Sequence, residues 1–349
     1  MNTNNLDTIS LSYDEVKDIL NQIKNVRVGV IGDGCLDIYW HADMTLSELS
    51  RETPHYPLPV VREHLYLGAG ANVAANLKSL GAKYVTILTV IGNDWRGREF
   101  LNILKTLDIC EENILCSDER ITPAYCKPLR KGISEVVYED PRLDFENFIP
   151  LLETDENLVV EQLRAMAAQV DIIAVCDQFR SGIITKKVHQ ELEALSKKGK
   201  LVVVDSRNNI RLYEDVIVKP NELECLRAFE DFPLQDIKDD DVFTAAIKLE
   251  AKTRKPVVVT RGDKGALWVE KGDITLAPSI PASPPIDLVG AGDAFMSAFC
   301  CAYSAGVPGA KAIAFANYAS AVVVKKIGMA GTANPEEILL RFKELNKDR

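Results

Sequence analysis

Apolar runs alternate with amphipathic segments along most of this 349-residue chain. The apolar runs are short, rich in Val and Ile, and show no polar alternation, which is typical of strands buried on both faces. They lie at residues 26–31, 85–91, 171–175, 201–205, 216–218 and 257–260. Segments with helical spacing separate them. This order predicts an α/β fold with a mostly parallel central sheet covered by helices on both sides.

Two helices at opposite ends of the chain are predicted by local signals. Near the N-terminus, Ser12 and Glu15 have the spacing of a capping box, and apolar residues follow at helical spacing up to Ile23. We expect this helix to pack on the rim of the sheet. Near the C-terminus, residues 294–305 are almost wholly apolar, which predicts a buried helix.

Two segments depart from the alternation, at about residues 36–66 and 121–140. Both mix aromatic and polar residues without a helical period, and the second has a plausible hairpin turn at residues 130–132. We expect edge strands outside the main sheet that together form one small β lid over a site. The alternative is that they are unrelated surface loops. The chain is then one domain, residues 1–349, with the lid inserted into it.

Composition limits the possible partners. Hydrophobic residues make up 47% of the chain and charged residues 26%, as in ordinary globular proteins, and the net charge of −10 argues against nonspecific nucleic-acid binding. The eight cysteines form no C-x-x-C pair, which favours a reduced, intracellular setting. The polar N-terminus and the lack of a long apolar run predict a soluble cytoplasmic protein that does not bind membranes.

The most informative motif is Asp-Leu-Val-Gly-Ala-Gly-Asp-Ala-Phe at residues 287–295. Its turn, Gly290, Ala291 and Gly292, opens the buried helix, so unpaired backbone N–H groups at the positive end of the helix dipole could bind an anion such as phosphate. Asp293 follows the turn. From its position alone, Asp293 is either an ordinary N-cap residue or a functional carboxylate.

This motif resembles the second signature of the PfkB carbohydrate-kinase (ribokinase-like) family, D-T-x-G-A-G-D-x-F. The resemblance implies that Asp293 is the base that deprotonates the sugar hydroxyl, and that the amides of Gly290, Ala291 and Gly292 hold the transferring phosphoryl group. Leu288 and Val289 stand where many members have threonines.

A second glycine-rich turn lies at residues 68–72, before another predicted helix. Taken alone, Gly68 and Gly70 indicate a turn or a close approach of the backbone to a ligand, and Asn72 can both donate and accept hydrogen bonds. The stretch resembles the first PfkB signature, which binds the sugar. Ala69 stands where ribokinases have a lysine.

Three further motifs fit the nucleotide half of such a kinase. Asn221 and Glu224 resemble the family's N-x-x-E, which organises Mg²⁺ on the nucleotide phosphates, although alone they indicate only a helix start. The loop that resembles T-x-G-x-x-G contributes Thr260, Gly262 and Gly265. Asn317 corresponds to a position beside the adenine, and some relatives imply a monovalent cation such as K⁺ near Asp287 and Gly328. A Walker loop and a complete G-x-G-x-x-G are both absent.

Within the family, the chain is similar to the heptose-7-phosphate kinases. Residues 32–40 resemble their G-D-x-M-L-D-x-Y-W, and residues 142–146 read R-L-D-F-E as theirs do. We expect Asp37, at the end of the first strand, to accept sugar hydroxyls. Arg142 is expected to bind the substrate phosphate. Other cations that could do so are Arg51, Lys127 and Arg130, and the alternative for all four cations is a solvated face.

The resemblance implies a ribokinase-like three-layer fold and ATP-dependent phosphorylation of a sugar or sugar phosphate, with Mg²⁺ held near Glu224 and the chain paired as a homodimer through its lid. The anomeric hydroxyl of a heptose 7-phosphate is one acceptor. Ribose, fructose or a nucleoside is an alternative, as is a catalytically silent sugar-binding protein of the same fold. The related bifunctional proteins carry a nucleotidyltransferase, but no His-x-Gly-His occurs in this sequence, so only the kinase step is expected.

Overall fold

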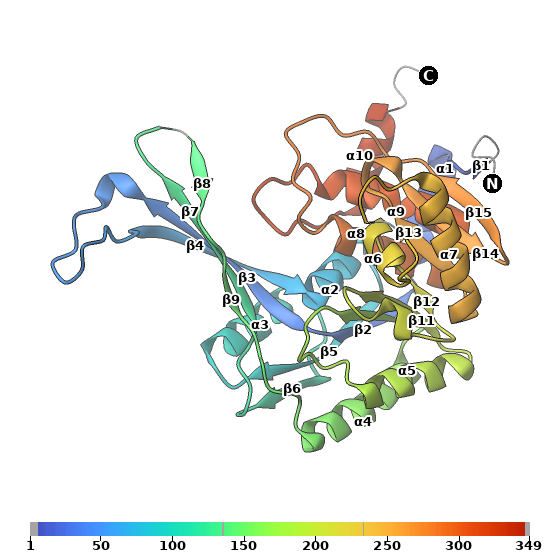
Figure 1. Cartoon of the computed structure of the whole chain (residues 1–349), viewed down its shortest axis with the longest axis horizontal. Coiled ribbons are helices and arrows are strands. Elements are labelled where there is room, and N and C mark those ends of the chain that lie inside the picture. The colour runs from blue at the N-terminus through green and yellow to red at the C-terminus, as the bar shows by residue number, and fades with distance from the viewer. Residues whose placement is uncertain (1–5, 135, 233, 346–349) are drawn as a thin grey trace.

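The computed structural model describes residues 6–134, 136–232 and 234–345. Its body is a ten-stranded sheet between two layers of helices, and a separate five-stranded sheet extends from one side of the body (Figure 1). From edge to edge, the large sheet contains β1 (Asp7–Thr8), β15 (Asp273–Ala277), β14 (Ala266–Glu270), β13 (Val257–Thr260), β12 (Ile217–Val218), β11 (Leu201–Ser206), β10 (Ile172–Asp177), β2 (Arg27–Gly32), β5 (Tyr84–Gly92) and β6 (Ile114–Ser117). All neighbours from β13 to β6 are parallel, and β14 pairs antiparallel with both of its neighbours.

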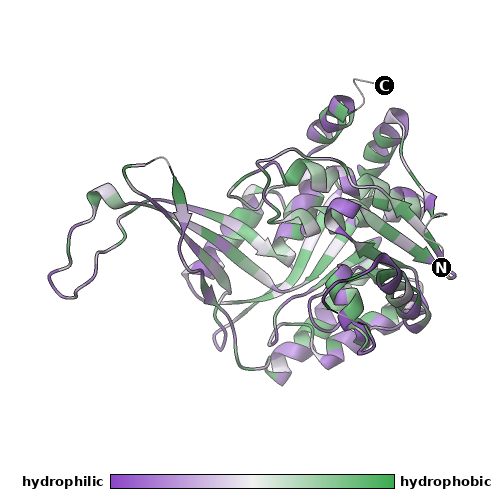
Figure 2. Cartoon of the chain, turned by 45° about the horizontal axis from the view of Figure 1, so that its top comes forward, coloured by the Kyte–Doolittle hydropathy of each residue, from purple (hydrophilic) through white to green (hydrophobic). Residues whose placement is uncertain are grey.

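Two hydrophobic cores lie on the two faces of this sheet. The first core takes buried residues from α1 (Tyr13–Ile23), α2 (Gly70–Ser79), α3 (Trp95–Thr106), α8 (Ala291–Ser304), α9 (Gly309–Val323) and α10 (Pro335–Leu345). The second takes them from α4 (Glu153–Gln169), α5 (Lys186–Lys197), α6 (Glu222–Arg227) and α7 (Asp239–Thr253). Figure 2 shows the strands between them as mostly hydrophobic, while the helices also carry hydrophilic residues. The predicted three-layer α/β arrangement is therefore present.

The second sheet, called the small sheet below, is made from the two unusual segments of the sequence. Its strands are β3 (Gly34–Asp43), β4 (Val60–Ala69), β7 (Ala124–Lys131), β8 (Val137–Glu139) and β9 (Leu143–Phe145). β3 is antiparallel to β4 and parallel to β7, and β7 also pairs with β8 and β9. The alternative that these segments are unrelated loops is wrong.

Two element boundaries and one packing prediction differ from expectation. α8 begins at Ala291, three residues before the apolar run, because the glycine turn itself forms its first turn. The predicted hairpin turn lies slightly later, since Arg130 and Lys131 still belong to β7. α1 contacts α8 and α10, whereas β1 extends the sheet edge beside β15.

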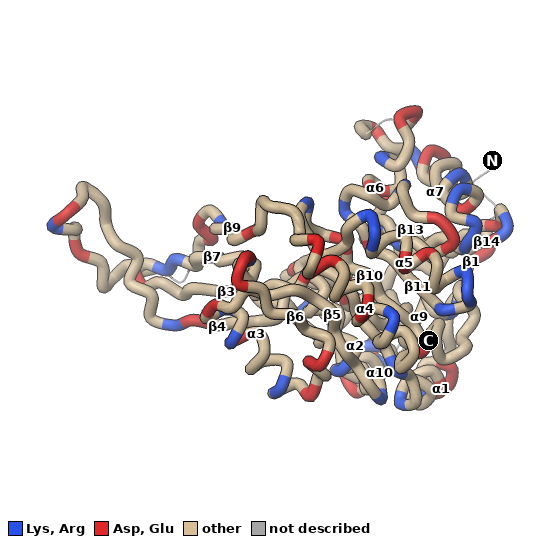
Figure 3. The backbone as a smooth tube through the Cα atoms, turned by 90° about the horizontal axis from the view of Figure 1, so that it is seen from below, with Lys and Arg blue, Asp and Glu red and all other residues tan. Residues whose placement is uncertain are grey.

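Charges are spread over the whole molecule. Lys and Arg are interspersed with Asp and Glu on both the body and the small sheet (Figure 3). Over the residues that the structure describes, no helix has the length and apolar character needed to cross a bilayer.

Candidate active site

The carboxyl ends of the parallel strands meet at one edge of the large sheet, where ligands of such sheets bind. Asp205 on β11 and the buried Lys219 after β12 form an ion pair there, with 2.8 Å between Lys219 Nζ and Asp205 Oδ2. Asn221 follows β12, Thr260 is the last residue of β13, and the two form a bridge with each other. Two of the predicted nucleotide residues therefore lie beside this charge pair.

The start of α8 opens onto this edge. Gly290 is its N-cap, in the left-handed conformation with φ of 78°, and no side chain caps the helix. Asp293 lies three positions further on, so its interpretation as an ordinary N-cap is wrong. Gly292 is exposed, and a Cβ built on it would have no other group within 4 Å. There is open space in front of this helix end.

Backbone N–H groups at the start of α8 point to an anion site. Those of Gly290, Gly292 and Asp293 have no hydrogen-bond partner within the described residues, while that of Ala291 donates to Leu288 O at 3.2 Å. Two of the three predicted amides are thus unpaired at the positive end of a 14-residue helix. That combination suits the oxygens of a phosphoryl group.

The carboxylate of Asp293 is held by a chain of amide side chains from α2. Asn72 Nδ2 donates to Asp293 Oδ2 at 2.7 Å. Asn76 Nδ2 donates to Asn72 Oδ1 at 3.3 Å, which orients the Asn72 amide so that its donor faces Asp293. Ser297 Oγ on α8 donates to Val73 O at 2.9 Å and fixes the two helices together. The first and second glycine motifs therefore meet at one carboxylate.

Asp293 titrates close to neutrality. Loss of surrounding water raises the pKa of Asp293 to about 7, the hydrogen bond from Asn72 opposes this, and the charges of Asp205 and Asp37 raise it further. A carboxylate of this kind is a better proton acceptor than an ordinary aspartate.

We expect Asn72→Ala to move the acidic limb of the pH dependence of kcat/KM upward from about pH 7, by about one pH unit, because the lost hydrogen bond stabilises the charged carboxylate. The measurement is kcat/KM between pH 5.5 and 9.5, compared with wild type at the plateau. The plateau itself also falls if Asn72 contacts the acceptor. A limb that stays in place or moves downward would contradict this role for Asn72.

Asp37 lies in the small sheet, in the middle of β3, and not at the end of the first strand as predicted. The chain leaves the large sheet at Gly32 and enters β3 at Gly34, so the apparent strand end is a crossing point between sheets. Asp37 is buried, and a Cβ on Gly68 would lie 2.9 Å from its Oδ1. Gly68 is therefore required for close packing against the carboxylate of Asp37.

Cations surround Asp37. Lys127 Nζ is 2.8 Å from Tyr39 Oη and 3.5 Å from Asp37 Oδ2. Burial raises the pKa of Asp37, and Lys127 and Arg142 oppose that rise. Arg142 itself forms two hydrogen bonds to Asp144, at 2.6 and 2.7 Å, and lies over the ring of Tyr125.

The other two predicted cations stand apart from this group. Arg130 pairs with Asp140 at 3.0 Å, and Arg51 is exposed.

The junction between the small sheet and α2 is strained at Ala69. Its φ of 50° and ψ of −133° fall in a region that residues with a side chain avoid. The next residue is held in place, since Gly70 N–H donates to Asp33 O at 2.8 Å. A Cβ on Gly70 would lie 3.1 Å from the same oxygen.

We expect Ala69→Gly to stabilise the protein by about 1 kcal/mol, since relief of strain of roughly 1–3 kcal/mol exceeds the added backbone entropy of glycine, about 0.5–1 kcal/mol. Unfolding in denaturant measures the change. Ala74→Gly inside α2 is the matched control and should destabilise by about 1 kcal/mol or more. Equal destabilisation by both changes would show that Ala69 is not strained.

Asn221 and Glu224 form a reciprocal capping box at the start of α6. Glu224 Oε2 accepts from Asn221 N–H at 2.8 Å, and Asn221 Oδ1 accepts from Glu224 N–H at 2.9 Å. Burial and the charge of Asp205 raise the pKa of Glu224. Its Oε1 has no hydrogen-bond partner among the described residues. One free carboxylate oxygen is compatible with Mg²⁺, which is bound by one or two carboxylates together with phosphates and water.

The predicted nucleotide loop and Asn317 meet at the end of β15. Gly265 has φ of 90°, and a Cβ on it would lie 2.1 Å from Ala277 O. Asn317 Nδ2 donates to the same oxygen at 3.1 Å and to Pro278 O at 2.9 Å. Gly262 has φ of 57° and opens the turn after Thr260. In this arrangement the Asn317 amide holds the protein backbone.

Asp287 lies beside Gly328, as predicted. Its Oδ1 accepts from Val289 N–H at 3.0 Å and its Oδ2 from Gly328 N–H at 2.9 Å. In the described residues, no group of three or more His, Cys, Asp or Glu side chains could hold a metal ion. The position of Asp287 fits a loop-fastening residue, and a monovalent cation there would need backbone oxygens as its main ligands.

Several residues of the site were missed in the sequence. Asn76 follows Asn72 by four residues on a helix, so its contact could have been found from that spacing. The pairing of Asp205 with Lys219 had no local signal, because the two residues come from different strands. Arg207, two residues after Asp205, was also overlooked.

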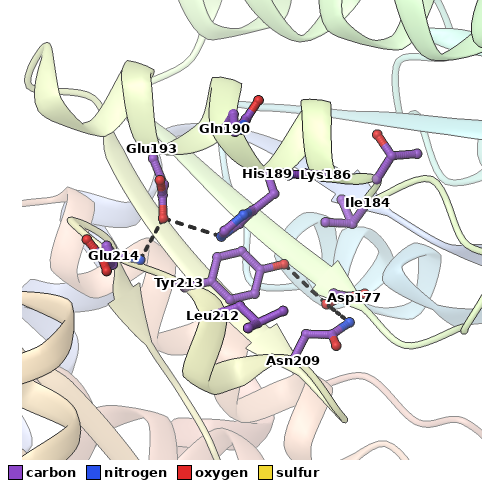
Figure 4. A pocket seen from close by; sticks show the side chains of 11 residues that line it. Asp177, Ile184, Lys186, His189, Gln190, Glu193, Asn209, Leu212, Tyr213 and Glu214 are labelled. Carbon is purple, nitrogen blue, oxygen red and sulfur yellow. Dashed lines mark hydrogen bonds and ion pairs between the residues drawn. The ribbon is translucent and has the colours of Figure 1, made fainter.

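A pocket of about 600 Å³ lies near the carboxyl end of β10, between α5 and the loop that follows β11 (Figure 4). It is lined by Asp177, Ile184, Thr185, Lys186, His189, Gln190, Glu193, Asn209, Leu212, Tyr213 and Glu214. None of the predicted site residues lines it. The helix that lines this pocket, α5, covers the face of the large sheet opposite to the face covered by α8.

Comparisons with known proteins identify the family of this chain. Residues 37–337 match the pfkB family carbohydrate kinase. Bifunctional protein HldE of Sulfurimonas denitrificans is 28% identical over 308 residues, which are 87% of this chain and 62% of that protein. Bifunctional protein HldE of Helicobacter pylori (strain Shi470) is 30% identical over 90% of this chain and 66% of its own length. The chain thus spans about two thirds of the length of these curated relatives.

Solved structures show the same fold. Phosphofructokinase-2 from Escherichia coli in complex with substrates and products superposes with a TM-score of 0.72 at 20% identity, covering 92% of this chain and 99% of that chain. Ribokinase from Arabidopsis thaliana complexed with ribose and ATP superposes with a TM-score of 0.67 at 21% identity, covering 91% and 99%. The fold is ribokinase-like, and with the match over residues 37–337 the chain belongs to the pfkB family of carbohydrate kinases.

Proposed function

We propose that this kinase transfers the γ-phosphoryl group of ATP to a hydroxyl group of a sugar phosphate, with the anomeric hydroxyl of a heptose 7-phosphate as the first acceptor to test. The observation that carries the proposal is the Asp293 carboxylate at the open start of α8. Its pKa of about 7 and its hydrogen bond from Asn72 suit a general base.

In the proposed reaction, Asp293 takes the proton of the acceptor hydroxyl. The hydroxyl oxygen forms a bond to the γ-phosphorus while the bond to the β,γ-bridging oxygen breaks, and the electron pair leaves with ADP. The unpaired N–H groups of Gly290 and Gly292 donate to the equatorial oxygens of the phosphoryl group. When bound, Mg²⁺ would neutralise charge on the phosphates, with Glu224 as the carboxylate beside it.

A phosphorylated acceptor is supported by charge. Asp37 suits a sugar hydroxyl, and Lys127 and Arg142 bring positive charge to the same part of the small sheet. The resemblance to heptose-7-phosphate kinases in residues 32–40 and 142–146 supports the same acceptor. We therefore assign the small sheet as the lid that covers the acceptor.

We also propose that two copies of the chain pair through the small sheet. Large apolar side chains are exposed along it, including Tyr56, Val60, Val61, Val137 and Leu143. Exposed apolar side chains of β4, β8 and β9 are available for such an interface. Light scattering of the purified protein should give twice the mass of 38.6 kDa. Val61→Glu should then shift the mass toward one chain.

The test of function is release of ADP from ATP and Mg²⁺ in the presence of two acceptor panels. One panel contains free sugars and nucleosides, and the other contains sugar phosphates including heptose 7-phosphate. The expected result is acceptor-dependent ADP release with the second panel, lost on chelation of Mg²⁺ and in Asp293→Asn. Turnover with ribose, fructose or a nucleoside would show that the acceptor is that compound and not a sugar phosphate. ATP and sugar binding without turnover on either panel would identify a silent binding protein.

A further inference from the structure

The cations around the proposed acceptor and nucleotide sites are nearly all committed to carboxylates. Lys219 pairs with Asp205 at 2.8 Å, and Arg142 pairs with Asp144 at 2.6 Å. Lys127 is shared between Tyr39 and Asp37. Each of these three already gives part of its charge and some of its donors to a carboxylate.

Arg207, near the same edge, has no such partner among the described residues. It follows β11, two residues after Asp205, and its backbone N–H donates to Asp177 O at 3.1 Å. Its side chain is exposed, and within the described ranges it forms no hydrogen bond or ion pair. A guanidinium without a partner can bind a ligand at no loss of an internal contact.

The positive charge of Arg207 lowers the pKa of groups on both sides of the site. Burial raises the pKa of Tyr125, and Arg207 opposes that shift together with Arg142. Burial also raises the pKa of Glu224, and Arg207 opposes it there as well. Tyr125 belongs to the acceptor side and Glu224 to the nucleotide side. β11 ends at Ser206, so Arg207 directly follows the strand whose Asp205 pairs with Lys219 at this edge.

The loop that carries Arg207 is firmly held. Asp177 is buried, and its Oδ2 accepts from Ser206 Oγ at 2.6 Å, Asn209 Nδ2 at 3.1 Å and Tyr213 Oη at 3.2 Å. Figure 4 shows the contacts of Asn209 and Tyr213 converging on Asp177. Side chains before and after Arg207 are thus held by one carboxylate, while the Arg207 side chain has no partner among the described residues. Such anchoring reduces the entropy lost when the side chain binds.

We propose that Arg207 is a further catalytic residue, which donates hydrogen bonds to the oxygens of the γ-phosphoryl group and stabilises the negative charge of its transfer. This rests on the proposed function. The planar guanidinium is suited to phosphate oxygens, and it keeps all of its protons throughout the reaction. The acceptor proton still goes to Asp293, and the bond that breaks is the one to the bridging oxygen of ADP.

Arg207→Met and Arg207→Lys test this role, and Arg211→Met is the matched control. Arg211 is an exposed arginine of the same loop without a hydrogen-bond or ion-pair partner in the described residues. We expect Arg207→Met to lower kcat about 10²- to 10³-fold with little change in acceptor KM, as removal of one transition-state donor does. Arg207→Lys should recover part of the loss. Arg211→Met should keep wild-type kcat, and all three should unfold at the wild-type temperature.

A second readout needs no acceptor. Calorimetric titration with Mg²⁺ and either ADP or a non-hydrolysable ATP analogue should show that Arg207→Met weakens binding of the analogue about tenfold or more, but that of ADP less than threefold. If the wild type transfers phosphate to no acceptor, the proposed function fails. The difference between the two affinity changes, for the analogue and for ADP, still tests the role of Arg207. Equal affinity changes for both nucleotides, or a kcat within threefold of wild type, would overturn the proposal.

Discussion

Asp293→Asn should lower kcat by about 10²- to 10⁴-fold while nucleotide affinity stays close to that of the wild type, because the change removes a general base without removing the amides that bind the phosphoryl group. The amide is nearly isosteric with the carboxylate and can still accept the hydrogen bond from Asn72 that Asp293 accepts at 2.7 Å. Steady-state ADP release gives kcat, and calorimetry gives the nucleotide affinity.

The same substitution should change stability in a direction set by pH. The folded-state pKa of Asp293 is raised to about 7, so folding favours the protonated carboxyl and the charged form destabilises the fold as the pH rises through that range. Asp293→Asn should therefore unfold at a higher temperature than wild type at pH 8, and the difference should vanish near pH 4. Wild-type turnover in this variant would move the role of base to another residue. A lower unfolding temperature at pH 8 would instead reveal damage to the fold.

Lys219→Met should destabilise the protein by about 3–5 kcal/mol, the range for removing one partner of a buried ion pair. Lys219 is buried and lies 2.8 Å from Asp205. Without it, the carboxylates of Asp205, Glu224 and Asp293 lose their shared counter-charge. Since Lys219 lowers the pKa of Asp293, the variant should also need a higher pH for activity.

Unfolding in denaturant at pH 8 measures the loss of stability caused by Lys219→Met. The double variant Lys219→Met with Asp205→Asn should recover part of it, because no unpaired charge then remains at the β11 end. Lys105 pairs with Glu111 at 3.3 Å on the surface, so Lys105→Met is the control and should change stability by less than about 1 kcal/mol. Equal effects of Lys219→Met and Lys105→Met would show that the buried pair contributes little.

The parallel strands could be predicted because their signal is local. Residues 257–260 were assigned to a strand and form β13 with the same bounds, since a continuous β-branched run has few other buried conformations. The small sheet was predicted as edge strands from two segments that together form one lid, but without their order or pairing. Its central pairing, of β3 with β7, joins residues far apart in sequence, and side-chain pattern carries no information about which distant strand is the neighbour.

The site was predictable where glycine, asparagine and aspartate occur in compact motifs. Asn72 and Asp293 came from two separate motifs, and the structure places them 2.7 Å apart. Asp37 was assigned to the wrong strand, because the break at Asp33 between two sheets leaves no proline or long polar loop in the sequence. Arg207 was missed for another reason, since a single arginine in a polar loop resembles any solvated residue until its lack of partners is known.

The parallel pairing of β3 with β7 also constrains how the chain folds. β4 follows β3 within one segment of chain and can form a hairpin with it early, but β3 has a second open edge until residues 124–131 have been synthesised. During translation, that edge faces solvent while α2, β5 and α3 are being made. An unpaired strand edge can recruit strands from other nascent chains, so slow translation through residues 70–123 should favour aggregation of this protein.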